Sequence, residues 1–341
     1  MKHFATLPPQ QRADFFNRLE ALAGTNPVIA EKDFWVVWLL GIIFKLPELG
    51  GHAVFKGGTS LSMVFGAIAR FSEDIDLGIR PETLGWPEDQ LESASKNAWT
   101  ERIRPQLEAD CARYVEQHWL PRLETEAIRA LGPAAPDKTW LRYQLDEASH
   151  SPLILFDYPG ALPRGMEYIA RSVKIEFGSL ADQRPAGGHP IRAMVSKIMP
   201  EGFPDFGAEV VALEIERTFW EKATILHAEF HRPAAKPQPA RYARHYADFA
   251  ALWRHAGGQR AATQLDLLER VRKHKSRFFA SSWANYATAV PGTLRFAPPE
   301  SRLDELRADY AAMRPMFLNP PPSFPEMLAI LREAEHTLNQ A

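Results

Sequence analysis

Two aspartates separated by one residue, Asp74 and Asp76, are the side chains of this sequence best suited to hold a metal ion. They alternate with Ile75, Leu77 and Ile79, which is the pattern of a strand that buries one face and projects both carboxylates from the other. Neighbouring carboxylates repel each other unless a cation lies between them, and oxygen ligands suit a Mg²⁺ ion that also binds water and phosphate. The pattern predicts a metal–phosphate site.

A glycine-rich segment precedes the aspartates. After a short apolar run and before apolar residues at helical spacing, the chain reads Lys56, Gly57, Gly58, Thr59, Ser60. This order predicts a strand, a glycine turn and a helix, with Ser60 near a helix N-terminus, where free amides attract phosphate. Lys56 precedes the glycines, whereas a Walker-type loop carries its lysine after them, so kinases and ATPases of that type are disfavoured. The combination favours a metal–phosphate site over a solvated acidic edge.

A third carboxylate is predicted on a second strand. In residues 171–178, Val173, Ile175 and Phe177 alternate with Lys174 and Glu176, so these two polar side chains should share the solvated face. This places a third carboxylate, Glu176, on a candidate sheet. The same alternation sends Glu73 away from the aspartates, as a solvent-facing neighbour.

Two helices further along carry charges on or beside their apolar stripes. From Ile215 the pattern is helical, and Lys222 lies at the edge of the stripe, where its ammonium needs an anionic partner. In the segment 241–255, Arg241, Arg244 and Asp248 share the face opposite an aromatic stripe. A simple salt bridge between the two helices, from Lys222 to Asp248, would give the ammonium such a partner.

Other charged groups allow two interpretations. A basic run is followed by Phe278, Phe279 and Trp283, and consists of Arg270, Arg272, Lys273, Lys275 and Arg277. It is a solvated helix face or an RNA-binding patch whose aromatic neighbours stack on bases. His227 and His231, four residues apart, are interpreted as helix-surface groups rather than metal ligands.

Periodicity also predicts the elements around these residues. Helices are expected over 8–22 and from Val28, where an apolar helix begins with the charged turn Glu31-Lys32-Asp33, interpreted as solvated. One or two amphipathic helices are expected over 84–130, strands over 140–145 and 153–158, and a loop over 187–204. The fold class is α/β (α+β), a mixed sheet with flanking helices and a helical C-terminal domain. The expected parts are N-terminal helices (1–50), a catalytic domain (51–205) and a C-terminal domain (206–341).

Composition bounds the setting. The 341 residues carry 40 Lys and Arg against 42 Asp and Glu, a net charge of −2, so any nucleic-acid surface must be local. The single cysteine, Cys111, excludes an intramolecular disulfide. The N-terminus has no apolar signal region, and no apolar run is long enough to span a bilayer. We expect a cytoplasmic protein without a membrane partner.

The sequence resembles the AbiEii/AbiGii nucleotidyltransferase toxins of type IV toxin–antitoxin systems, within the polymerase-beta-like superfamily. The resemblance rests on KGGTSLSMVFGAIARFSEDIDLGI and on three further blocks, EKDFW (31–35), ERTFWEK (216–222) and RHYADF (244–249). It spans roughly residues 25–255 and leaves the last third unmatched.

The resemblance implies a nucleotidyltransferase fold and a reaction. Asp74 and Asp76, with Glu176, would hold Mg²⁺ (or Mn²⁺) that bridges the triphosphate of a bound NTP. Lys222 and Asp248 would be essential, Lys222 by neutralising triphosphate charge. The remaining nucleotide-binding candidates are Lys56, Gly57, Gly58, Thr59, Ser60 and Arg244. The acceptor would be the 3′ end of tRNA or another RNA, and a separately encoded antitoxin would be the partner.

Two other functions remain open at this point. One is a nucleotidyltransferase that modifies a protein or a small molecule. The other is a partner-binding module that keeps the fold without the chemistry, against which the intact aspartate pair argues. The identity of the NTP, the acceptor, and direct binding by the antitoxin do not follow from the sequence.

Overall fold

The computed structural model describes residues 1–72, 74–147, 149, 151–162, 170–199, 203 and 205–340. The chain forms two compact units: Met1–Thr59 with Glu73–Ala212, and Ser60–Ser72 with Leu213–Ala341. The predicted three-part division stays a prediction. Glu73, expected to face the solvent, lies outside the described residues.

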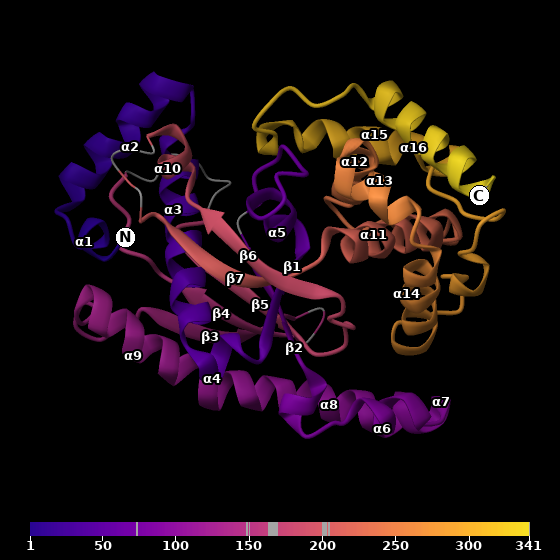
Figure 1. Cartoon of the computed structure of the whole chain (residues 1–341), viewed down its shortest axis with the longest axis horizontal. Helices are drawn as coiled ribbons and strands as arrows, with labels where there is room; N and C mark the ends of the chain where they lie inside the picture. The colour runs from indigo at the N-terminus through magenta and orange to yellow at the C-terminus, as the bar shows by residue number, and fades with distance from the viewer. Residues whose placement is uncertain are drawn as a thin grey trace. The chain divides into compact units, whose positions relative to one another are not determined.

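The first unit combines a sheet with helices (Figure 1). Its helices are α1 (Lys2–Ala5), α2 (Pro9–Ala23), α3 (Pro27–Lys45), α4 (Pro47–Gly50), α6 (Glu88–Ser93), α7 (Lys96–Ala98), α8 (Arg104–Tyr114), α9 (Leu120–Leu131) and α10 (Met194–Ile198). Its strands are β1 (Ala53–Lys56), β2 (Ile75–Ile79), β3 (Leu141–Leu145), β4 (Pro152–Phe156), β5 (Val173–Gly178), β6 (Ala186–Arg192) and β7 (Gly207–Leu213). Helix α5 (Gly57–Met63) begins at the residue after β1.

The strands form one mixed sheet with the order β3-β4-β5-β2-β1-β7-β6 in the described part of the chain. β2 runs parallel to β5 and antiparallel to β1, while β3, β4 and β5 are antiparallel neighbours. The prediction of an α/β protein with a mixed sheet is confirmed, and so are the predicted strands near 140–145, 153–158 and 173–178.

Helix α3 is buried nearly all round, as its apolar composition predicts. Asn26 caps it by accepting a hydrogen bond from the Val28 N–H (2.9 Å), and Trp38 stacks on Phe156 of β4 at 5.3 Å between ring centroids. Because large aromatic rings bury 150–250 Å² each, such contacts contribute strongly to the core of this unit.

The charged residues Glu31, Lys32 and Asp33 lie in the second turn of α3 and are buried, so their interpretation as a solvated helix start is wrong. Glu31 accepts a hydrogen bond from the Ala161 N–H (2.6 Å), Lys32 donates to the Ala170 carbonyl (3.0 Å), and Asp33 accepts from the Met194 N–H (2.6 Å). Burial raises the pKa of Asp33 to about 6, although the Met194 hydrogen bond opposes the shift. These charges hold neighbouring backbone in place, because buried ionised groups need such partners.

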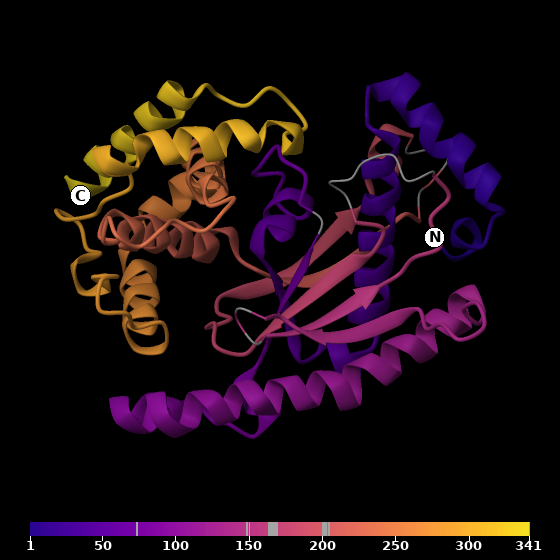
Figure 2. The same cartoon turned by 180° about the vertical axis from the view of Figure 1, so that it is seen from behind.

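One continuous helical segment runs from Lys96 to Leu131 (Figures 1 and 2). It joins α7, α8 and α9 through two π-helical segments, Trp99–Ile103 and Val115–Trp119. A proline follows each π segment within two residues, and proline cannot donate the backbone hydrogen bond of a regular turn. The prediction of amphipathic helices over 84–130 is confirmed.

The loop predicted over 187–204 is wrong in part, since β6 and α10 lie within it; Pro200, Glu201, Gly202 and Pro204 are outside the described residues. Two glycines and Pro190 hide the strand, because these residues have low strand propensity. β6 lies at the edge of the sheet, where a proline is tolerated.

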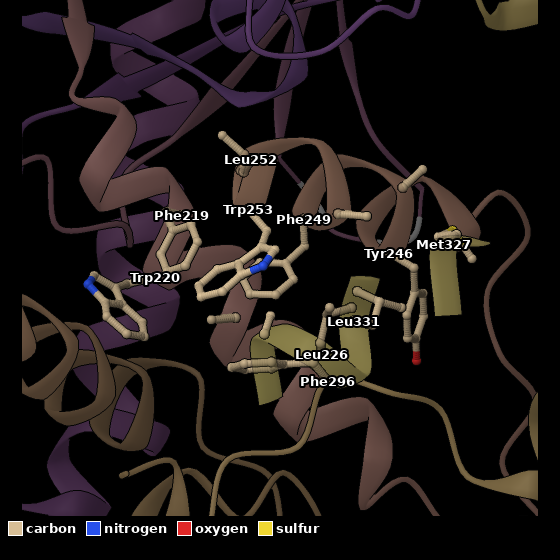
Figure 3. Close-up of a cluster of buried hydrophobic side chains, with 14 of the residues drawn as sticks. Phe219, Trp220, Leu226, Tyr246, Phe249, Leu252, Trp253, Phe296, Met327 and Leu331 are labelled. Atoms are coloured by element: carbon tan, nitrogen blue, oxygen red, sulfur yellow. The ribbon is translucent and has the colours of Figure 1, made fainter. Parts of the chain in front are cut away.

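The second unit is helical in its described residues, which confirms the predicted helical C-terminal domain. It comprises α11 (Ile215–Phe230), α12 (Ala243–Arg254), α13 (Ala256–Ala262), α14 (Leu265–Phe278), α15 (Leu303–Ala312) and α16 (Phe324–Asn339). Figure 3 shows its core, in which Phe219 of α11, Phe249 of α12 and Leu331 of α16 converge. Leu61 and Ile68, from the segment after the glycines, join the same core.

His227 on α11 is fully buried in this unit, so its assignment to the helix surface is wrong. Its Nδ1 accepts a hydrogen bond from the Arg295 N–H (3.2 Å), while Nε2 lies 3.2 Å from the Asn285 carbonyl and 3.1 Å from Thr288 Oγ1. An Nδ1 that accepts and an Nε2 that donates define the neutral ring. Burial, with the nearby His231 ring, lowers the pKa of His227 to about 4.

His227 is expected to destabilise the protein as the pH is lowered from about 6.5 towards 4, whereas Asp33, whose pKa is raised by burial, has the opposite effect in the same range. In that window the unfolded chain binds a proton at His227 that the folded protein excludes. Melting temperatures of the wild type and His227→Gln, each measured at pH 7 and pH 5, check this. The variant should show the smaller drop, whereas His336→Gln, at an exposed histidine, should keep the wild-type drop.

Candidate active site

The register of three strands gathers the predicted charges of the first unit on one face of the sheet. In the parallel β2–β5 pair, Asp76 lies opposite Glu176, and in the antiparallel β1–β2 pair Lys56 lies opposite Asp76. Directly paired residues project to the same side of a sheet. The carboxylates of Asp76 and Glu176 are therefore neighbours. The alternation in each strand predicted the face to which each side chain projects, but not this pairing.

Asp74 immediately precedes β2 and contacts the same group of charges through Lys174. The Lys174 ammonium lies 3.1 Å from Asp74 Oδ2 and 2.5 Å from Glu176 Oε1. Although partial burial opposes it, these two carboxylates raise the pKa of Lys174 above its ordinary value. We call this group the carboxylate cluster; it consists of Asp74, Asp76, Glu176 and the lysine between them, Lys174.

The carboxylate cluster has the donor atoms of a divalent-metal site. Its oxygen donors are those that Mg²⁺ and Mn²⁺ prefer, and the Lys174 ammonium shows that a cation is accommodated between two of them. Within the described residues, no three His, Cys, Asp or Glu side chains form a ready-made metal cage. The donor set fits a divalent ion, and the assignment of Asp74, Asp76 and Glu176 as ligands stays a prediction.

Gly57 allows the carboxylate of Asp76 to lie against the start of α5. Its φ of +82° is a conformation that favours glycine, and a Cβ at this position would collide with the Asp76 carboxylate, coming within 2.7 Å of its Cγ. The predicted glycine turn is thus reduced to Gly57, because α5 begins at that residue. The Thr59 hydroxyl donates to the Asp74 carbonyl (2.5 Å), which ties α5 to the segment before β2.

Gly57→Ala is expected to displace the Asp76 carboxylate and to lower nucleotide transfer by about tenfold or more, with about 1–2 kcal/mol lost in stability from the positive φ. Gly85→Ala is the matched control, because Gly85 has φ +80° but no atom within 4 Å of its Cβ position. Transfer assays and urea unfolding of both variants check this. Equal losses of activity in the two would contradict the steric argument.

In the second unit, Asp248 of α12 accepts hydrogen bonds from two cations. Arg70 Nε and Nη2 donate to Oδ1 and Oδ2 at 2.7 and 2.8 Å, and Lys222 Nζ donates to Oδ2 at 2.8 Å. The Asp248 side chain is 1% exposed, as it is fully enclosed by these partners and the helices. The salt bridge between α11 and α12, kept as an alternative at the sequence level, is present.

Burial alone would raise the pKa of Asp248, but the charges of Arg70 and Lys222 outweigh it and hold that pKa well below its usual range. Burial lowers the pKa of Lys222, and the negative charge of Asp248 opposes this shift. The Lys222 ammonium makes a further contact, 3.1 Å from His245 Nδ1. Since an ammonium only donates, Nδ1 of His245 is the acceptor.

Sequence reasoning missed Arg70 and His245. Lys222 already supplied a partner for Asp248, so the pattern required no second cation, although Arg70 stands just before the aspartates. The expected charged face of α12 is wrong, because Asp248 is buried, Arg244 is exposed and Arg241 precedes the helix. Ser60 lies near the N-terminus of α5, as predicted, but it is the fourth residue of the helix and is fully buried.

The basic run lies on α14 in the second unit. Glu269 pairs with Arg272 (2.7 Å) and with Lys273 (3.2 Å), so part of the positive charge is compensated. Phe278 is buried in the core, which makes its predicted role in stacking on bases wrong, while Phe279 lies under the Lys275 ammonium at 5.0 Å.

A family model described as "Nucleotidyl transferase AbiEii toxin, Type IV TA system" matches residues 38–332. The chain belongs to the AbiEii nucleotidyltransferase toxin family. It is a nucleotidyltransferase, and its family consists of the toxins of type IV toxin–antitoxin systems, which implies an NTP substrate, a divalent metal and an antitoxin partner. The resemblance seen in the sequence is confirmed, but its expected extent is wrong, because the family match continues through the last third of the chain to residue 332.

Among solved structures, this AbiEii chain is similar to MenT4, a nucleotidyltransferase toxin from Mycobacterium tuberculosis H37Rv. The identity is 14% and the TM-score 0.36, over 90% of this chain and 99% of the other. A search of curated proteins found no match. No helix in the described residues has the length and apolar character needed to cross a bilayer.

Proposed function

We propose that this AbiEii toxin transfers a nucleoside monophosphate from an NTP to a hydroxyl at the 3′ end of tRNA, with Mg²⁺ as the metal. The observation that carries the proposal is the register of β2 and β5, which sets Asp76 beside Glu176 with Asp74 next to them. In the reaction the acceptor oxygen bonds to the α-phosphorus while the bond to the β-phosphate oxygen breaks, so pyrophosphate leaves.

Each unit contributes a set of residues to this proposal. In the first unit, Asp74, Asp76 and Glu176 hold the metal, which when bound neutralises triphosphate charge and polarises the phosphoryl oxygens. The backbone near Gly58 and the lysine Lys56 bind phosphate oxygens. Since both ions suit carboxylate ligands, Mn²⁺ is expected to substitute for Mg²⁺.

In the second unit, Lys222 supplies positive charge to the triphosphate. Asp248 is a positioning residue, because both of its oxygens are engaged by Arg70 and Lys222 and its side chain is buried. His245 restricts Lys222 further through Nδ1. Two of the three ammonium protons thereby have fixed partners, which leaves a defined direction for the third. Arg244, exposed on the first turn of α12, is available to the nucleotide.

Labelled nucleotides test the reaction. Each of the four NTPs, labelled at the α- or the γ-phosphate, is incubated with the protein, Mg²⁺ and either tRNA or total protein. The proposal is supported if tRNA becomes labelled and protein does not, and if the label comes from the α-phosphate and not from the γ-phosphate. A tRNA whose 3′ diol has been oxidised by periodate should accept no label. Label on protein alone would show that the acceptor is a protein instead.

The basic run on α14, from Arg270 to Arg277, is the proposed contact with RNA. Replacing the exposed Arg270 and Lys273 by glutamate is expected to weaken tRNA binding about tenfold and to flatten its dependence on salt, because fewer counterions are released. Arg332→Glu on α16, also an exposed cation of this unit, is the control. Binding titrations at several salt concentrations check this, and an unchanged affinity would assign α14 to the solvated surface.

A further inference from the structure

Lys174 occupies a position that the proposed reaction does not use. It extends from β5 on the same face as Glu176, two residues along the strand, and its ammonium contacts both Glu176 and Asp74. The same oxygens are the proposed metal ligands. The protein therefore supplies its own cation to the group that should bind a metal.

The position of Lys174 has two opposite effects: its charge stabilises the neighbouring carboxylates and repels a divalent ion. Asp76 and Glu176 are direct neighbours across β2 and β5, and like charges in that arrangement destabilise a sheet. An ammonium bonded to the adjacent carboxylates reduces this repulsion. A divalent ion on Asp74 and Glu176 would meet the same positive charge, however, and would be repelled by it.

Lys174 is also free to leave. Its side chain is 33% exposed, and lysine carries its charge on a flexible four-carbon stem that can reach solvent or a phosphate oxygen. A buried ammonium without such an exit would exclude the metal altogether. This one can be displaced, and the triphosphate of a bound NTP would give it a new anionic partner.

We propose that Lys174 is a positioning residue that acts as an internal competitor for the metal, holding Asp74 and Glu176 until a divalent ion displaces its ammonium. This inference rests on the proposed function, because it takes these two carboxylates as metal ligands. Its consequence is weak metal binding by the nucleotide-free toxin. Metal and NTP then bind together more readily than either does alone, since the NTP accepts the displaced ammonium.

Mn²⁺ binding to the full-length protein without nucleotide tests the competition. The electron paramagnetic resonance signal of free Mn²⁺ is titrated with the wild type, Lys174→Met, Lys174→Arg and Lys138→Met. Lys174→Met is expected to bind Mn²⁺ about tenfold more tightly than the wild type, because one positive charge beside the ion is removed in a partly solvated site. Lys174→Arg, which keeps the charge, and Lys138→Met, at an exposed lysine of the same unit, should resemble the wild type.

A second readout, thermal stability, does not depend on activity. In the presence of a metal chelator, Lys174→Met should melt at a lower temperature than the wild type, because Asp74 and Glu176 lose their shared cation. Added Mn²⁺ should raise its melting temperature by more than it raises that of the wild type. Circular dichroism at low temperature establishes that each variant is folded.

The outcomes separate the two claims. Tighter binding by Lys174→Met supports the competition, including the case in which the wild type shows no measurable binding. Equal binding by both overturns the role of Lys174 while the metal site stands, and weaker binding by Lys174→Met shows that the lysine assists the metal, which also overturns it. Absence of binding in every variant would reject the metal ligands of the proposed function, and the inference with them.

Discussion

Asp76→Asn is expected to reduce nucleotide transfer by roughly a thousandfold, because several kcal/mol of charge stabilisation depend on a metal-binding carboxylate. Asparagine has nearly the same shape, so the pairing of β2 with β1 and β5 should survive. Transfer rates with labelled NTP measure the effect, and overexpression of the variant should no longer arrest growth.

Glu209→Gln is the matched control for this prediction. Glu209 is an exposed carboxylate on β7 of the same sheet, outside the carboxylate cluster, and its replacement by the amide should leave the rate unchanged. If Asp76→Asn kept more than about a tenth of the wild-type rate while remaining folded, the metal-ligand role of Asp76 would be rejected.

Asp248→Asn is expected to lower the free energy of unfolding by about 3–5 kcal/mol, because it leaves the buried Arg70 and Lys222 without their common anion. The carboxylate is charged in the folded protein well below its usual pKa, so its stabilising contribution is present above the unfolded pKa, near 4, and is lost as the pH falls. Urea unfolding at pH 7 and at a pH well below 4 measures both effects, and the difference between variant and wild type should shrink at the lower pH.

A double-mutant cycle distinguishes a charge network from simple packing. Arg70→Met alone should cost less than Asp248→Asn, since Asp248 then keeps Lys222 as its partner. In the double variant only one cation remains unpaired, so the two costs should sum to more than the measured loss. Strict additivity would show that the three side chains do not act together.

The sequence predicts those parts of the site that depend on local periodicity. Asp76 and Glu176 alternate with apolar residues in their own strands, so their orientation follows from each strand alone. Their pairing depends on which strands are neighbours. The resemblance to a family implied an acid on a neighbouring strand, whereas the parallel register of β2 with β5 comes from the structure. The burial of Lys222 followed from its position at the edge of an apolar stripe.

Long-range partners explain what sequence reasoning missed. Arg70 and Asp248 are 178 residues apart, and neither neighbourhood requires the other. The segment around Arg70 is fixed by hydrogen bonds between Phe71 and Met316 (2.7 Å) and between Leu318 and Ala69 (3.0 Å), which no periodic pattern announces. His227 was misassigned for the same reason, since its partners come from a segment without regular structure in the last third of the chain.

The helix from Lys96 to Leu131 shows how a strict spacing is kept over a long distance. Its buried residues recur at every fourth position: Trp99, Ile103, Leu107, Cys111, Val115, Trp119, Leu123 and Ala127. A regular helix advances about 400° in four residues, so such a row would drift by about 40° at each repeat and wind most of the way round within seven.

The two π segments, which place an additional residue in a turn, counteract this drift. Most of the drift is therefore offset, and Trp119 near the far end of the row still packs edge-on against Phe177 of β5, at 4.9 Å between ring centroids. The two π segments raise the number of residues per turn, so that residues four apart remain near the same face of the helix. A one-residue deletion in either turn would rotate everything beyond it by about 100° and carry the following buried residues away from the sheet.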